Sequence, residues 1–147
     1  MNVKLGNCKT SAQAVTKICY NEPTRNLDFR IQCKDLEDLK RCVRIIKGYN
    51  DFDWEKVNKA LDAWANFKRI NNTDLLTYEI GREGSPVIYI RYSLLGLSGN
   101  YQKGNQIKKL TDKLFKKSME TLAGLARADE CHFTVEFGYK YCRLWWD

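Results

Sequence analysis

Residues 104–127, GNQIKKLTDKLFKKSMETLAGLAR, constrain the fold most because they form the longest run with a single periodicity. At 100° per residue, the large apolar side chains gather on one arc of a helix and the cations gather on another. The apolar arc holds Ile107, Leu110, Leu114, Phe115, Leu122 and Leu125, and the cationic arc holds Lys109, Lys113, Lys116, Lys117 and Arg127. The pattern predicts a long helix with one face packed on a core and one basic face.

The other elements are predicted from alternating apolar residues, helical spacing and turn residues. Asp35 and Asp53 are the expected N-caps of two further helices. In chain order we expect a short strand at residues 3–5, a helix from residue 10 or 11, a strand at 27–33, a helix that stops at Gly48, a helix from 53 to 71, a hairpin of strands 75–81 and 87–92 joined by a loop at 82–86, and strands at 131–137 and 139–146.

This order predicts an α+β fold in a single compact domain over residues 1–147. The sheet should be mainly antiparallel, because the strands at 75–81 and 87–92 are expected to form a hairpin. Three or four helices are expected, including the long basic amphipathic helix near residues 105–127.

The charge balance favours an anionic partner, since 25 basic and 18 acidic residues leave a net charge of +7. No apolar run reaches the roughly 20 residues that span a bilayer, and the amino terminus lacks the apolar segment of a secretory signal. We therefore expect a cytoplasmic protein without membrane contact. The six cysteines have irregular spacing and no Cys-x-x-Cys pair, so we expect them to be reduced and mostly buried.

Three groups of residues are candidates for binding a nucleic acid or a nucleoprotein. The first is the basic start of the long helix, the second is a basic helix face near residue 40, and the third is the carboxyl-terminal stretch, in which aromatic rings alternate with cations. Consecutive side chains of a strand point to opposite faces, so at least one of two adjacent tryptophans should lie near the surface. The candidates are Lys108, Lys109, Lys113, Lys116 and Lys117; Lys40, Arg41 and Arg44; and Tyr141, Arg143, Trp145 and Trp146.

The sequence assigns no catalytic residue, metal ligand or cofactor. His132 is the single histidine, and its neighbour Cys131 should point to the opposite face of a strand, so the two should not form a catalytic dyad. Gly99 and Gly104 have the glycine spacing of a P-loop, but the following lysine and hydroxyl residue are missing. Residues 96–104 are therefore expected to form a flexible loop that enters the helix, and contact with an anion there stays open.

One alternative comes from a resemblance in the order of elements over about residues 27–137. Tyr101-Gln-Lys-Gly104, followed by Ile107 and Leu110, is similar to the pyrophosphate-binding loop and helix of GCN5-related N-acetyltransferases. The resemblance implies acetyl transfer from coenzyme A as an alternative function.

A second resemblance concerns the layout from Tyr78 through the hairpin and the lysine-rich helix to the strand at Phe133. This layout resembles that of small phage-encoded inhibitors of bacterial immunity, anti-CRISPR proteins among them. It implies a non-enzymatic binding protein that occupies a nuclease or its guide RNA inside a bacterial host cell. A protein–protein interaction module without nucleic acid remains a third possibility.

Overall fold

The computed structural model of the chain describes residues 10–49, 51–66, 76–93, 101–136 and 139–147, so the predicted strand at residues 3–5 lies outside the described residues. The described elements are α1 (Ser11–Cys19), β1 (Phe29–Cys33), α2 (Leu36–Ile46), β2 (Gly48–Tyr49), β3 (Phe52–Asp53), α3 (Trp54–Ala65), β4 (Leu76–Glu83), β5 (Ser85–Ser93), α4 (Tyr101–Ala126), β6 (Glu130–Glu136) and β7 (Tyr139–Trp145). The predicted α+β class with a mainly antiparallel sheet is confirmed.

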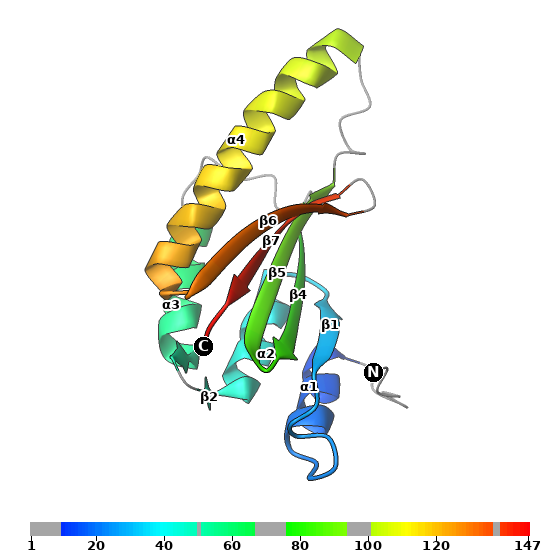
Figure 1. The fold of residues 1–147 in the computed structure, drawn as a ribbon, viewed down its shortest axis with the longest axis vertical. Helices are drawn as coiled ribbons and strands as arrows, with labels where there is room; N and C mark the ends of the chain where they lie inside the picture. Colours follow the sequence, from blue (N-terminus) through cyan, green and yellow to red (C-terminus); the bar gives the residue numbers. More distant parts are fainter. Residues whose placement is uncertain (1–9, 50, 67–75, 94–100, 137–138) are drawn as a thin grey trace.

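Within the described residues, five antiparallel strands form the main sheet in the order β1-β4-β5-β7-β6. The last strand, β7, lies between β5 and β6, so β6 is an edge of the sheet. Figure 1 shows α2, α3 and α4 on one side of the sheet and the beginning of α4 projecting past the end of the strands. Strands β2 and β3 pair with each other in a separate short ribbon.

The predicted helix starts are confirmed by their capping hydrogen bonds. The side chains of Thr10, Asp35 and Asp53 accept hydrogen bonds from backbone N–H groups of the first turns of α1, α2 and α3. These caps satisfy N–H groups that the helices themselves leave without partners. Helix α3 ends at Ala65, earlier than predicted, and the rest of its predicted range lies mostly outside the described residues.

The β4–β5 hairpin turns more tightly than its sequence suggested. Glu83 already pairs with Ser85, and Gly84 alone makes the turn, with a positive φ of 71°. The predicted loop at residues 82–86 is therefore mostly strand. The carboxylate of Asp28 accepts a hydrogen bond of 2.9 Å from the Gly84 N–H, which fixes the turn against the segment that precedes β1.

The buried face of α4 differs from the predicted one. Phe115 and Leu122 are buried as expected, but Leu114 and Leu125 are 38% and 45% exposed. The other buried positions of this helix carry smaller or more flexible side chains, namely Ser118, Met119, Ala123 and Ala126. The apolar positions at Ile107 and Leu110 lie in the part of α4 whose side chains are outside the described residues.

Two tryptophans from other elements supply the volume that these small residues leave. The indole N–H of Trp64 in α3 donates a 2.6 Å hydrogen bond to the Ser118 hydroxyl. The indole N–H of Trp146 donates a 3.0 Å hydrogen bond to the Ala126 carbonyl. Large side chains facing small ones pack at the density of a protein interior, which explains why the helix turns this side to the core.

Gly81 allows β1 to lie against β4, which gives a first prediction. A Cβ atom at residue 81 would collide with the carbonyl oxygen of Phe29 and would lie 3.2 Å from the Cα of Arg30. We expect Gly81→Ala to lower the free energy of unfolding by about 1–3 kcal/mol, because backbone must move to make room. Urea denaturation followed by circular dichroism measures this change.

Gly124 provides the matched control for this substitution. It lies within α4, and an added Cβ would meet no atom within 4 Å. Gly124→Ala should therefore raise the free energy of unfolding by about 0.5–1 kcal/mol, since alanine is the better helix former. Equal effects of the two substitutions would contradict the steric explanation.

Candidate binding surface

The basic face of α4, defined here by Lys113, Lys116 and Lys117, lies beside the edge strand β6. All three lysines are exposed, and the ammonium group of Lys116 lies 5.8 Å from the centre of the Phe133 ring in β6. Within the described part of the chain, none of the three forms an ion pair. Among the side chains that the structure describes, these three lysines therefore have no carboxylate partner along this flank of the sheet.

The limits of this basic face follow from its neighbours in the helix. Lys108 and Lys109 belong to α4, but their side chains lie outside the described residues. Glu120 is exposed and follows Lys116 by four residues, so it interrupts the positive charge toward the carboxyl end. The described cations are concentrated where the helix meets β6.

The predicted basic face of α2 is a separate surface, because α3 packs between α2 and α4. The ammonium group of Lys40 lies 2.5 Å from Asp62 in α3 and 3.5 Å from Glu37. The hydrogen bond from Lys40 to Asp62 raises the pKa of Lys40. Lys40 therefore ties α2 to α3, and its charge is compensated.

The two arginines of α2 remain at the surface. Arg41 and Arg44 are exposed, and the guanidinium of Arg44 lies 5.8 Å from the ring centre of Trp54. Neither is brought near the basic face of α4 by the fold. The cationic candidates of α2 and those of α4 therefore lie on two separate surfaces that one short ligand would not contact together.

A layer of arginines and aromatic rings lies on the sheet face opposite the core, which no described helix covers. Tyr89 in β5 is 2% exposed there, because the Arg30 guanidinium lies 3.8 Å above its ring and Tyr141 lies beside it at a centroid distance of 6.0 Å. The Arg91 guanidinium is 5.3 Å from the Tyr141 ring. Glu79 forms ion pairs with Arg30 and Arg91.

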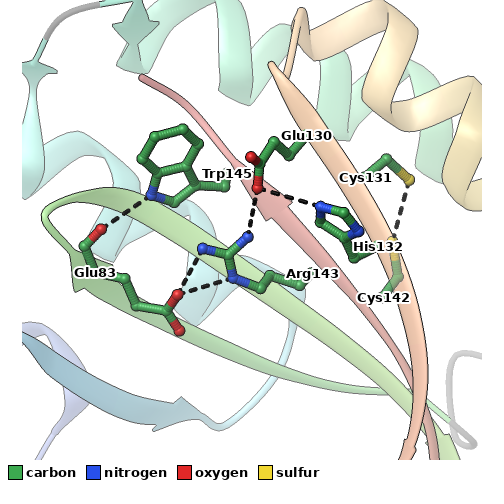
Figure 2. A network of polar contacts seen from close by, with 7 residues as sticks. All are labelled: Glu83, Glu130, Cys131, His132, Cys142, Arg143 and Trp145. Atoms are coloured by element: carbon green, nitrogen blue, oxygen red, sulfur yellow. Dashed lines mark hydrogen bonds and ion pairs between the residues drawn. The ribbon is translucent and has the colours of Figure 1, made fainter.

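Arg143 is the centre of a polar network on the same sheet face (Figure 2). Its guanidinium makes hydrogen bonds of 2.6 and 2.9 Å to Glu83 and one of 2.9 Å to Glu130. The Glu130 carboxylate also lies 3.3 Å from Nε2 of His132. The indole N–H of Trp145 donates to the carbonyl oxygen of Glu83 at 3.1 Å. The network joins the β4–β5 turn to β6 across β7.

Among the described residues, the charges on this sheet face balance each other. Its three arginines, Arg30, Arg91 and Arg143, are matched by Glu79, Glu83 and Glu130. The sheet face therefore has the aromatic and arginine content of an interaction surface, but it does not supply the excess positive charge that an anionic polymer would need.

The expectation for Trp146 is wrong in one respect, because its side chain cannot contact a partner. It is 0% exposed, and its ring packs edge-on against Phe52 at a centroid distance of 5.1 Å. Trp145 is half-buried on the opposite side of the chain. The prediction that at least one of the two lies near the surface is thus met by Trp145, and Tyr141 and Arg143 are half-buried beside it.

The structure also corrects the prediction of a loop at residues 96–104, on which the acetyltransferase resemblance rested. Helix α4 begins at Tyr101, so residues 101–104 form its first turn, and residues 94–100 lie outside the described residues. Cys131 is half-buried and His132 is exposed on the other face of β6, so they form no dyad, as predicted. Among the described residues, no group of three or more His, Cys, Asp or Glu side chains is arranged to hold a metal ion.

Sequence reasoning missed Arg30, Tyr89 and Arg91 as members of a common surface. Alternation places each of them on the solvent side of its own strand. Their meeting with Tyr141 depends on β7 pairing with β5, whose register joins Arg91 to Tyr141 and Tyr89 to Arg143. No local pattern specifies that pairing.

Comparison with known proteins identifies no relative: no protein family, curated protein or solved structure matches this chain. None of the described helices has an apolar stretch long enough to cross a membrane.

Proposed function

We propose that this chain is a non-enzymatic binding protein that engages a nucleic acid or a nucleoprotein through the basic face of α4. The observation that carries the proposal is that Lys113, Lys116 and Lys117 are exposed and have no ion pairs among the described residues. Lys40 and Arg143, by contrast, are both held by carboxylates. Uncompensated cations attract phosphate groups most strongly.

The spacing of these lysines supports a role in binding rather than in stability. Lys113 and Lys117 are four residues apart on a helix, a separation at which like charges destabilise the helix by about 0.2–0.5 kcal/mol. Lys116 has an acidic residue four positions away on each side in the sequence, Asp112 and Glu120. A bound anion would remove the repulsion between Lys113 and Lys117.

The position of the helix is suited to a polymer. Figure 1 shows that the beginning of α4 projects beyond the sheet, so a ligand along that part of the helix would not collide with the strands. At about 1.5 Å per residue, the 26 residues of α4 extend about 39 Å. Several consecutive phosphates of a nucleic acid would fit along that length.

A charge-reversal variant tests the proposal. Lys113→Glu, Lys116→Glu and Lys117→Glu together change the net charge from +7 to +1, a difference of three times −2. Fluorescence anisotropy with labelled single-stranded and duplex oligonucleotides measures affinity at several salt concentrations. We expect at least about tenfold weaker binding, and a slope of log K against log salt that is shallower by about 2 for single strands and about 3 for duplexes.

The control reverses three exposed cations that are not binding candidates, Lys17→Glu, Lys34→Glu and Lys59→Glu, and gives the same net charge. It should keep most of the affinity, because long-range attraction falls but the contacts of α4 remain. If the two variants lose affinity equally, net charge and not the face of α4 determines binding. If the wild type binds no oligonucleotide, the nucleic-acid proposal is wrong.

A protein partner is the second candidate, and the balanced arginine–aromatic layer of the sheet favours it. Tyrosine, tryptophan and arginine dominate the energy of protein interfaces, and the layer contains all three in Tyr141, Trp145 and Arg91. Binding through this face would depend little on salt. Capture from a bacterial lysate, with and without nuclease treatment, separates a nucleic-acid partner from a protein partner.

The resemblance to inhibitors of bacterial immunity gives the proposal its most specific form, inhibition of a CRISPR-type nuclease. Such an inhibitor needs no turnover, only occupancy of the nuclease or its guide RNA. A target-cleavage assay with the purified nuclease complex tests this form, and the same charge-reversal variant should restore cleavage.

A further inference from the structure

Two cysteine thiols meet between β6 and β7 (Figure 2). The sulfur atoms of Cys131 and Cys142 are 3.5 Å apart. Cys131 is half-buried, whereas Cys142 is fully buried beneath the sheet. A disulfide bond is about 2.05 Å long, so the two sulfurs would have to approach by about 1.5 Å to form one.

The register of the strands allows this approach. Cys131 is paired with Leu144 and Cys142 with Phe133, so the two cysteines are diagonal neighbours on the same face of the hairpin. Diagonal neighbours are somewhat farther apart than most disulfide-bonded residues, and bond formation therefore needs a small strand movement. Strand β6 can make that movement because, in the described sheet, it pairs with β7 alone.

The two thiols are chemically unequal. The hydrogen bond between the two thiols lowers the pKa of Cys131, although burial and the charge of Glu120 in α4 oppose this. The hydrogen bond to Cys131, burial and nearby charge raise the pKa of Cys142. Because Cys131 is half-buried and Cys142 is fully buried, water solvates a thiolate better at Cys131, and a small reagent can reach it there.

We propose that Cys131 and Cys142 form a redox-active dithiol, in which Cys131 attacks low-molecular-weight disulfides and Cys142 resolves the mixed disulfide. In the first step, the Cys131 thiolate bonds to one sulfur of the reagent and expels the other as a thiolate. In the second step, the Cys142 sulfur bonds to the Cys131 sulfur, and the remaining reagent thiolate leaves. The two cysteine protons end on the two released thiols, and two electrons pass from the protein to the reagent.

This inference is independent of nucleic-acid binding. The disulfide would link the edge strand β6, which borders the basic face of α4, covalently to the interior strand β7. A diagonal cross-strand bond is strained, and strained disulfides are reduced more readily than relaxed ones. The modification should therefore be reversible under mild reducing conditions.

The test is incubation of the folded, reduced protein with glutathione disulfide, followed by acid quenching, alkylation and mass spectrometry. A Cys8→Ser background removes the cysteine that lies outside the described residues. We expect the intact protein to lose two hydrogen atoms and peptide mapping to show a Cys131–Cys142 bond. Dithiothreitol should return the original mass. In the Cys142→Ala variant, we expect a stable glutathione adduct on Cys131 instead.

Two other sites in the chain act as internal controls. Cys33 and Cys42 also form a hydrogen-bonded thiol pair, but they are 3% and 0% exposed. Cys19 is a half-buried thiol whose nearest described polar partner is Arg82, at 3.5 Å. Both sites should react more slowly than Cys131 in the folded protein.

Three results would overturn the proposal, and the Cys8→Ser protein can give each of them without a further substitution. Oxidation of Cys33 and Cys42 at the same rate would mean that the reaction proceeds through unfolded chains. A stable adduct on Cys131 without an internal disulfide would show that Cys142 does not resolve it. Modification of Cys19 while Cys131 stays reduced would show that Cys131 is not the reactive thiol.

Discussion

Replacing Trp146 with alanine is expected to lower the free energy of unfolding by about 3–5 kcal/mol, the range found for buried tryptophan and phenylalanine. The side chain is 0% exposed and packs edge-on against Phe52. Its removal would leave a cavity facing the small residues of α4 and would leave the Ala126 carbonyl without the indole donor. Urea denaturation followed by far-UV circular dichroism measures the loss.

Trp145 is the matched control because it is the same residue type one position earlier. It is half-buried, and its indole bonds to the Glu83 carbonyl at the surface. Trp145→Ala should cost about 1 kcal/mol, mainly through the lost hydrogen bond and partial packing. If Trp145→Ala costs as much as Trp146→Ala, the assignment of Trp146 to the core and Trp145 to the surface is wrong.

Trp146→Phe separates packing from hydrogen bonding. Phenylalanine keeps an aromatic ring beside Phe52 but has no N–H to donate to Ala126. Trp146→Phe should therefore lower the free energy of unfolding, but by less than Trp146→Ala does.

Local rules were sufficient for the elements that depend on short segments. Asp35 and Asp53 could be identified as N-caps because the hydrogen bonds that they make reach no farther than three residues. The alternation of Phe29, Ile31 and Cys33 with polar neighbours likewise predicted which face of β1 is buried. The fold class follows from the order of such elements.

Local sequence patterns could not predict which strands pair with each other in the sheet. The order β1-β4-β5-β7-β6 places the last strand inside the sheet, although nothing in its own sequence indicates two neighbours. As a result, Tyr141 meets Tyr89 and Arg91, and Arg143 meets Glu83 and Glu130. The candidate surface was therefore predicted for α4, where one helix defines it. On the sheet, where five strands contribute, only the residues near the carboxyl terminus were predicted.

Periodicity alone also misplaced part of the buried face of α4. An apolar arc drawn from large side chains includes Leu114 and Leu125, which are eleven residues apart and so lie nearly above one another on the helix. Both are exposed. The helix instead buries the side on which Ser118 and Ala126 receive the indoles of Trp64 and Trp146. The helix has two apolar sides, and the bulky side chains of Trp64 and Trp146, which come from distant parts of the sequence, determine which of them is buried.

The comparison of Leu122 with Leu125 tests this corrected face directly. Leu122 is 1% exposed and Leu125 is 45% exposed, on the same helix and three residues apart. Leu122→Ala should lower the free energy of unfolding by about 2–5 kcal/mol, because it removes a buried side chain and leaves a cavity. Leu125→Ala should change it by less than about 0.5 kcal/mol, as surface substitutions usually do.

Because both substitutions put the same residue into the same helix, helix propensity cancels in the comparison and burial remains. Urea denaturation of the two variants, analysed with a common slope, gives the difference between them. Similar losses for both would mean that Leu125 is covered in solution, either by a second copy of the chain or by a segment outside the described residues. A concentration-dependent midpoint for the wild type would then identify the second copy, since association stabilises only the folded state.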